Sequence, residues 1–131
     1  MFGLSVKQSQ GLGLHLLQEK GKYNAFLGTS LGKHLFSKEN INKYFEWAHE
    51  YTQKFILVID DYEERLNYIV FKQLSPEEAL ERALTIGKDL EKAYNSILSL
   101  KNNQSIKVIR TEKIFTTEKC MNITNQIDRC I

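Results

Sequence analysis

Proline and cysteine are scarce in this sequence, and neither sign of charge dominates. One proline and two cysteines stand among 131 residues, and 18 basic against 16 acidic side chains leave a net charge of +2. A balance this close provides no bulk attraction to nucleic acid or to a membrane surface. No apolar run approaches the roughly 18 residues that cross a bilayer. We therefore expect no membrane association and a cytoplasmic protein.

Residues that commonly bind metals or form disulfides lack the necessary spacing. Cys120 and Cys130 form no CxxC pair, and His15, His34 and His49 form no HExxH or similar arrangement. We expect reduced cysteines and no bound metal. The length is typical of one domain, and 42% hydrophobic with 26% charged residues is an ordinary globular composition. Residues 1–131 are therefore interpreted as a single domain.

Apolar segments alternate with turn signals along the chain. Strands are predicted at residues 24–28, 55–59 and 106–109, and a short strand is compatible with residues 2–6. Helices are predicted after Ser37, at about residues 62–72 and 76–100, and from residue 117, with Ser75 as a capping serine. The unbroken apolar run 55–59 is typical of a strand covered on both faces. This alternation predicts an α/β fold: a Rossmann-like, open, mostly parallel sheet with helices on both faces.

Ligands of such sheets bind beyond the carboxyl ends of the strands, which directs attention to residues 28–34 and to Asp60 and Asp61. Gly28, Ser30 and Gly32 match the G-x-S-x-G pattern of a hydrolase nucleophile elbow. That family places an acid and then a histidine after the serine, and no histidine follows residue 49, so a triad hydrolase is disfavoured. The alternative is that the two glycines only form a turn and that Ser30 hydrogen-bonds the backbone.

A longer ordered set of features covers about residues 22–115. It comprises a strand entering G-x-S, a glycine two residues after that serine, Phe36-Ser37 before the next helix, Trp47-Ala48 near its end, an apolar strand closing in Asp60, and a long helix with Lys88-Asp89-Leu90. In this order the features resemble the N-terminal half of the tRNA-dependent cyclodipeptide synthases. That family in turn resembles the catalytic domain of class I tyrosyl- and tryptophanyl-tRNA synthetases.

The resemblance implies that aminoacyl-tRNA is the substrate and that Ser30 takes the aminoacyl group as an ester, on the way to a diketopiperazine. The substrate is already an activated ester, so no cofactor is implied. Gly28 would allow close approach of the aminoacyl group. Phe26 and Leu57 would line the pocket for its side chain, unless they are plain core residues. Lys33 occupies a position where one branch of the family has asparagine.

The family's first tRNA lies along a basic face of the long helix, but residues 76–100 here hold three basic and five acidic side chains. Basic residues further along the chain are candidates to compensate, or they form a solvated edge: Lys101, Lys107, Arg110, Lys113 and Lys119. The sequence ends where the family's second half would begin. We therefore expect a missing C-terminal half or a homo-oligomer, and the alternative function is a non-catalytic module that binds tRNA, a nucleotide or a protein.

Overall fold

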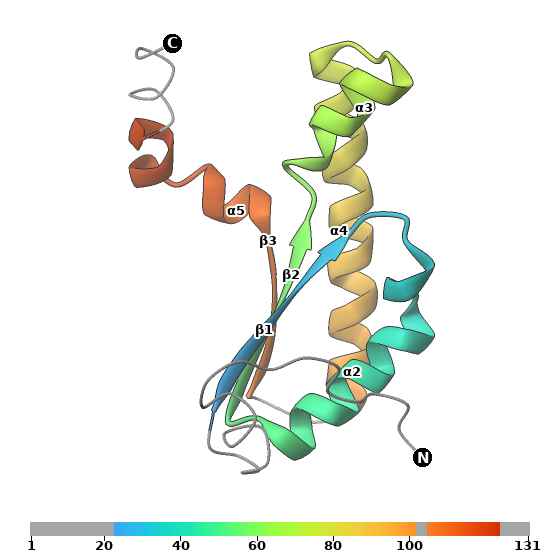
Figure 1. The fold of residues 1–131 in the computed structure, drawn as a ribbon, viewed down its shortest axis with the longest axis vertical. Helices are drawn as coiled ribbons and strands as arrows, with labels where there is room; N and C mark the ends of the chain where they lie inside the picture. The colour runs from blue at the N-terminus through green and yellow to red at the C-terminus, as the bar shows by residue number, and fades with distance from the viewer. Residues whose placement is uncertain (1–22, 102–104, 124–131) are drawn as a thin grey trace, which may run out of the picture.

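A computed structural model describes residues 23–101 and 105–123 (Figure 1). In chain order its elements are β1 (Asn24–Ser30), the 3-10 helix η1 (His34–Phe36), α2 (Lys38–Tyr51), β2 (Lys54–Asp60), α3 (Glu64–Lys72), α4 (Pro76–Lys101), β3 (Ile106–Arg110) and α5 (Thr111–Phe115). Residues 118–123 are also helical. The strand considered at residues 2–6 lies outside the described residues.

The three strands form one parallel sheet in the order β1-β2-β3. Asn24 pairs with Lys54 and Ser30 with Asp60, so the first two strands run in register over their whole length. β2 pairs with β3 from Phe55 to Ile59. Helices connect the successive strands, and α2 and α4 lie on the same side of the sheet (Figure 1). The predicted open, parallel, Rossmann-like sheet is confirmed.

The core lies between the sheet and the helices α2 and α4. Alternate residues of β2 are buried there, with Phe55 3% and both Leu57 and Ile59 0% exposed. They join one cluster with the following residues of the two helices: Ile41, Phe45 and Ala48 of α2, and Ala83, Tyr94 and Leu98 of α4. Burial of these apolar side chains is the main contribution to the stability of the fold.

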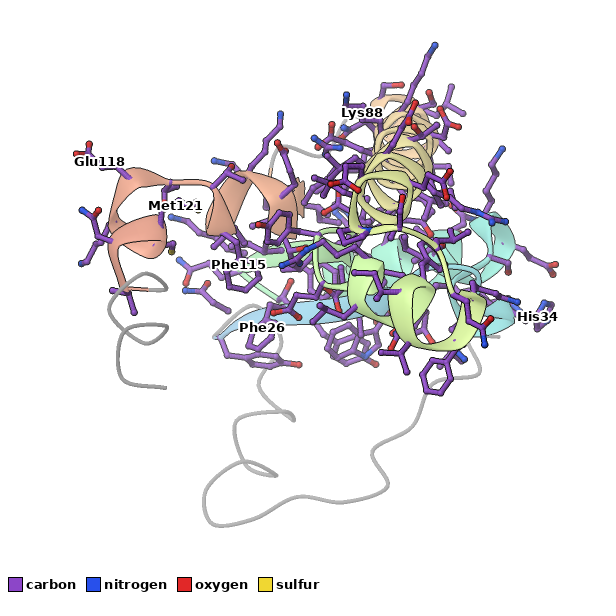
Figure 2. All side chains as sticks on the ribbon, turned by 90° about the horizontal axis from the view of Figure 1, so that it is seen from above. Phe26, His34, Lys88, Phe115, Glu118 and Met121 are labelled. Atoms are coloured by element: carbon purple, nitrogen blue, oxygen red, sulfur yellow. The ribbon has the colours of Figure 1, made fainter. Side chains whose placement is uncertain are left out.

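The second face of the sheet differs from the expectation for residues 55–59. Ile56 is 39% and Phe26 77% exposed, so the described helices cover only one face at these strands. Figure 2 shows Phe26 projecting from the side of the sheet that lies away from α4. An apolar run has the same appearance in sequence whether its second face is covered or exposed, so the run alone did not predict the exposure of Ile56.

The predicted helix starts are present. The Ser37 hydroxyl accepts a hydrogen bond from the Asn40 amide at 3.4 Å, and the Ser75 hydroxyl accepts one from the Glu78 amide at 3.2 Å. Each serine satisfies an amide that has no partner within its own helix. Across the residues that the structure describes, every helix is too short or too polar to span a bilayer.

Candidate functional site

The carboxyl ends of β1 and β2 bring Ser30 and Asp60 side by side. These two residues are the last pair in the register of the two strands. Side chains alternate between the faces of a strand, so Phe26, Gly28 and Ser30 share the face opposite the core. An added Cβ at Gly28 would meet no described atom within 4 Å. Among the described residues, none therefore covers the backbone at Gly28, two residues before Ser30.

The loop after Ser30 is held at both ends. Leu31 is 5% exposed and belongs to the core cluster. Gly32 follows with a φ of +71°, a backbone conformation that favours glycine. At the far end of the loop the Tyr94 hydroxyl, on α4, donates a 2.7 Å hydrogen bond to the Phe36 carbonyl. This loop ties the site to the long helix.

Two loop residues considered from the sequence, Lys33 and His34, are exposed. His34 lies at the periphery of the molecule, far from Phe26 (Figure 2). Its backbone carbonyl accepts a 3.0 Å hydrogen bond from the Asn40 side chain at the start of α2. His34 thus has a structural contact through its backbone, and its imidazole extends toward solvent.

The structure does not bring Phe26 and Leu57 together. Leu57 pairs with Leu27, is 0% exposed, and lies in the core between the sheet and the helices. Phe26 is on the opposite face. The β2 residue that pairs with Gly28 is Val58, which shares the face of Phe26 and is half-buried. The sequence analysis does not name Val58, because an unbroken apolar run does not indicate which of its residues shares the face of Gly28.

Asp60 and Asp61 have different environments in the structure, contrary to the expectation that both lie at the ligand-binding end of the strands. Asp61 is fully buried. Its Oδ1 accepts hydrogen bonds from the backbone amides of Tyr62 (2.8 Å) and Glu112 (3.0 Å) and from the Thr111 hydroxyl (3.1 Å). Asp61 therefore holds the ends of β2 and β3 together, and only Asp60 remains beside Ser30.

Arg110 is the buried cation opposite Asp61. It is 3% exposed, and its guanidinium nitrogens lie 3.2 Å from Asp61 Oδ2, 2.8 Å from Glu112 Oε2 and 3.7 Å from Glu91 Oε2. Arg110 is thus unavailable to a polyanion, which corrects its place among the candidate compensating residues. Lys101 is 3.6 Å from Glu46, whereas Lys107, Lys113 and Lys119 are exposed.

Glu63 adds a second carboxylate close to Asp60. Partial desolvation of the largely exposed carboxylate, followed by the charge of Asp60 and a hydrogen bond to its side chain, raises the pKa of Glu63 above its ordinary value. The Thr111 hydroxyl also lies 3.4 Å from Asp60 Oδ1. The carboxyl end of β2 is consequently acidic. Within residues 23–101 and 105–123, no group of three histidine, cysteine or acidic side chains is arranged to hold a metal ion.

Glutamine at position 63 (Glu63→Gln) is expected to stabilise the protein at neutral pH and to have no effect in mild acid. A raised folded-state pKa means that the native protein loses stability as the pH rises through that pKa. Because Glu63 is exposed, the gain should stay within about 1 kcal/mol. Urea unfolding of Glu63→Gln and of the wild type, in neutral and in acidic buffer, measures this gain in stability. Glu64→Gln is the control, because Glu64 contacts Asn67 (3.1 Å) at the same helix end; an equal or lower stability of Glu63→Gln at neutral pH would contradict the prediction.

No protein-family model and no curated protein sequence matches the chain. A cyclodipeptide synthase from Fluoribacter dumoffii matches in structure with a TM-score of 0.70 and 12% identity, over 88% of this chain and 51% of that one. One from Streptomyces noursei gives a TM-score of 0.58 and 22% identity, over 84% and 52%.

A third match is a Mycobacterium tuberculosis protein whose structure relates cyclodipeptide synthetases to type I tRNA synthetases. Its TM-score is 0.62 at 17% identity, over 73% of this chain and 42% of that protein. The chain thus spans about half the length of the structures that it matches. Over that half, its described residues have the Rossmann-like fold of the cyclodipeptide synthases.

Proposed function

We propose that the chain is a cyclodipeptide synthase-like aminoacyltransferase that uses aminoacyl-tRNA and forms an aminoacyl ester on Ser30. One observation carries the proposal. Ser30 stands at the carboxyl end of β1 on the open face of the sheet, beside Gly28 and in register with Asp60, within a fold shared with cyclodipeptide synthases. Ligands of parallel α/β sheets bind at this end of the strands.

In the first step the Ser30 Oγ attacks the carbonyl carbon of the ester that joins the amino acid to the tRNA. The bond between that carbon and the ribose oxygen breaks, and the proton lost by Ser30 ends on the freed ribose hydroxyl. Asp60 is the carboxylate aligned with Ser30 and is proposed to relay this proton. Ester exchange of this kind needs no further activation of the substrate.

Two amide-forming steps complete the cycle. The amine of the seryl-bound aminoacyl group attacks the ester of a second aminoacyl-tRNA, which forms one peptide bond and releases that tRNA. The amine of the dipeptidyl group then attacks the seryl ester, forms the second peptide bond and frees Ser30. Each amine loses one proton and each departing oxygen gains one, so the protons balance over the cycle.

The open face beside Ser30 is proposed to hold the first amino acid. Gly28 leaves space for the aminoacyl backbone, and Phe26 and Val58 flank it with apolar surface on the same face. Lys33 is exposed in the loop after Ser30 and is proposed to contact the tRNA end. Leu57 takes no direct part, because it lies in the core.

Substitution of Ser30 by alanine is expected to abolish an aminoacyl adduct completely. Wild-type protein and the variant are incubated with a pool of charged tRNAs, intact mass spectrometry detects the adduct, and the supernatant is searched for cyclic dipeptides. Ser99→Ala is the control, because Ser99 is an exposed serine on α4 whose hydroxyl bonds only to the Ser96 carbonyl among the described contacts (2.8 Å). An adduct that persists in Ser30→Ala would refute the assignment.

A non-catalytic, protein-binding module is the second candidate. The exposure of Phe26 and Ile56 on the open sheet face favours it, since apolar patches often bind partners. The same experiment separates the two. Folded wild-type protein that acquires neither an adduct nor a product would support the module.

A further inference from the structure

Tyr62, Arg65 and Phe115 form an aromatic cluster just beyond the carboxyl end of β2. The Arg65 guanidinium carbon lies 3.9 Å from the centre of the Tyr62 ring. The ring of Phe115, the last residue of α5, has its centre 6.2 Å from that of Tyr62, and the two ring planes meet at 31°. Figure 2 shows Phe115 projecting from α5 toward the sheet. All three side chains are partly exposed, so this end of β2 presents a flat apolar surface with one positive charge.

The backbone that carries the aromatic cluster is held in place. The Tyr62 amide donates hydrogen bonds to Asp61 Oδ1 (2.8 Å) and to Thr111 Oγ1 (3.1 Å). The Tyr62 carbonyl accepts a 2.6 Å hydrogen bond from Arg65. Thr111 is the first residue of α5 and Phe115 the last, so both rings are fixed relative to the strand ends. A ligand of this surface would therefore pay little entropy for ordering it.

The aromatic cluster is adjacent to the proposed site of acyl transfer. Tyr62 follows Asp60 by two residues, and Asp60 is in register with Ser30. Attack by Ser30 requires the ribose that bears the amino acid to lie beside these residues. In aminoacyl-tRNA this ribose belongs to the 3′-terminal adenosine, so its base must lie within the length of one nucleoside from Ser30. The Tyr62 ring is the aromatic surface that follows the end of β2 directly.

We propose that the aromatic cluster binds the base of the 3′-terminal adenosine of tRNA by stacking. The inference rests on the proposed function, because the ester attacked by Ser30 brings this adenosine to the end of β2. Unpaired bases stack on aromatic rings and on arginine planes, and the terminal adenosine of tRNA is unpaired. Arg65 on the Tyr62 ring combines both kinds of surface.

The charge around the aromatic cluster suits a nucleoside better than a phosphate. Asp60 and Glu63 make this end of β2 acidic, and carboxylates repel a phosphate group. They accept hydrogen bonds from ribose hydroxyls, and parallel sheets that bind nucleotides use an acidic side chain for this contact. The structure therefore favours the nucleoside portion of the tRNA end at this position.

A purely structural role for the aromatic cluster is the alternative, in which Arg65 and Phe115 only fix the turn after β2. Tyr68 on α3 provides a matched comparison. Its ring also faces an arginine, with the Arg82 guanidinium carbon 5.5 Å from the ring centre, but Tyr68 packs against the hydrophobic core. The two tyrosines have similar chemistry, and Tyr62 alone directly follows the strand end.

Equilibrium binding of uncharged tRNA tests the proposal, because it requires no acyl transfer. Fluorescence anisotropy compares a pool of intact tRNA with the same pool after removal of the terminal adenosine. We expect the wild type to bind intact tRNA about tenfold more tightly than the shortened form. Tyr62→Leu should abolish this difference by weakening only the binding of intact tRNA. Tyr62→Phe, which keeps a ring, and Tyr68→Leu should both retain the difference.

Phe115→Leu is a second variant that should also reduce the difference, and it serves if Tyr62→Leu does not fold. Equal affinity of the wild type for both tRNA forms, or no binding of either, would overturn the proposal. So would an equal loss for both forms in Tyr62→Leu. The Ser30 experiment gives a separate result: an adduct without any preference for intact tRNA refutes only the stacking site. A Tyr62-dependent preference without an adduct supports the stacking site and refutes only the acyl transfer.

Discussion

Replacement of Arg110 by methionine is expected to lower the free energy of unfolding by about 3–5 kcal/mol. The guanidinium is 3% exposed and lies 3.2 Å from the fully buried Asp61 carboxylate. Without Arg110, Asp61 keeps its hydrogen bonds from Tyr62, Thr111 and Glu112 but loses the opposite charge in a place that water does not reach. An uncompensated buried charge is far more costly than the net contribution of the intact pair.

Urea unfolding measures this loss, with Lys107→Met as the control. Lys107 is an exposed cation on the same strand, and its substitution should change stability by no more than about 0.5 kcal/mol. The double variant Asp61→Asn with Arg110→Met should recover part of the loss, because the remaining side chain is neutral. A loss below about 1 kcal/mol in Arg110→Met would show that Asp61 does not depend on this cation.

Alanine in place of Gly87 is expected to destabilise the fold by about 1–3 kcal/mol or more. A Cβ at this position on α4 would lie 2.5 Å from Asp61 Cβ and 2.8 Å from Asp61 Cγ. Neither group can move easily, because Asp61 is fixed by hydrogen bonds and the helix backbone is packed on the sheet. Helix propensity alone predicts the opposite, a gain of up to about 1 kcal/mol.

The sign of the stability change in Gly87→Ala therefore shows whether the steric contact with Asp61 outweighs the gain in helix propensity. Thermal or urea unfolding measures this change. Ser96→Ala, an exposed change on the same helix, should stay within about 0.5 kcal/mol of the wild type. If Gly87→Ala were as stable as the wild type or more so, α4 would have to lie farther from Asp61 than the structure places it.

Local sequence signals predicted most of the secondary structure. Serine caps, apolar periodicity and the run of residues 55–59 each depend on neighbours within a few positions, and the helices and strands they predict are present. The placement of Ser30 beside Asp60 was also predictable. It follows from the general rule that the carboxyl ends of parallel strands meet at one edge.

The register of the strands could not be predicted from the sequence. A shift of one residue exchanges the two faces of a strand. The unbroken apolar run of β2 contains no polar alternation that would show whether Leu57 or Val58 shares the face of Gly28. The family resemblance implied Leu57 as a pocket residue, with a plain core position as the alternative, and the structure places Leu57 in the core and Val58 on the face of Gly28.

The burial of Arg110 depends on residues that are distant in sequence. Its partners come from the end of β2, from α4 and from α5, and no local pattern links Asp61, Glu91 and Glu112. A cation at the end of a strand is usually exposed, which is why it was grouped with the surface lysines. The packing of Gly87 on Asp61 could not be predicted either, because these two residues are also distant in sequence.

The loop that follows Ser30 is ordered by folding and not by a ligand. Leu31 anchors its start in the core, and Tyr94, 1% exposed, binds the Phe36 carbonyl at its end. The conformational entropy of this segment is thus largely lost before any substrate arrives. Ordering a flexible loop on binding would weaken affinity, whereas a preorganised loop avoids that loss. A ligand that binds beside Ser30 would contact a loop whose conformation is fixed by the packing of the long helix on the sheet.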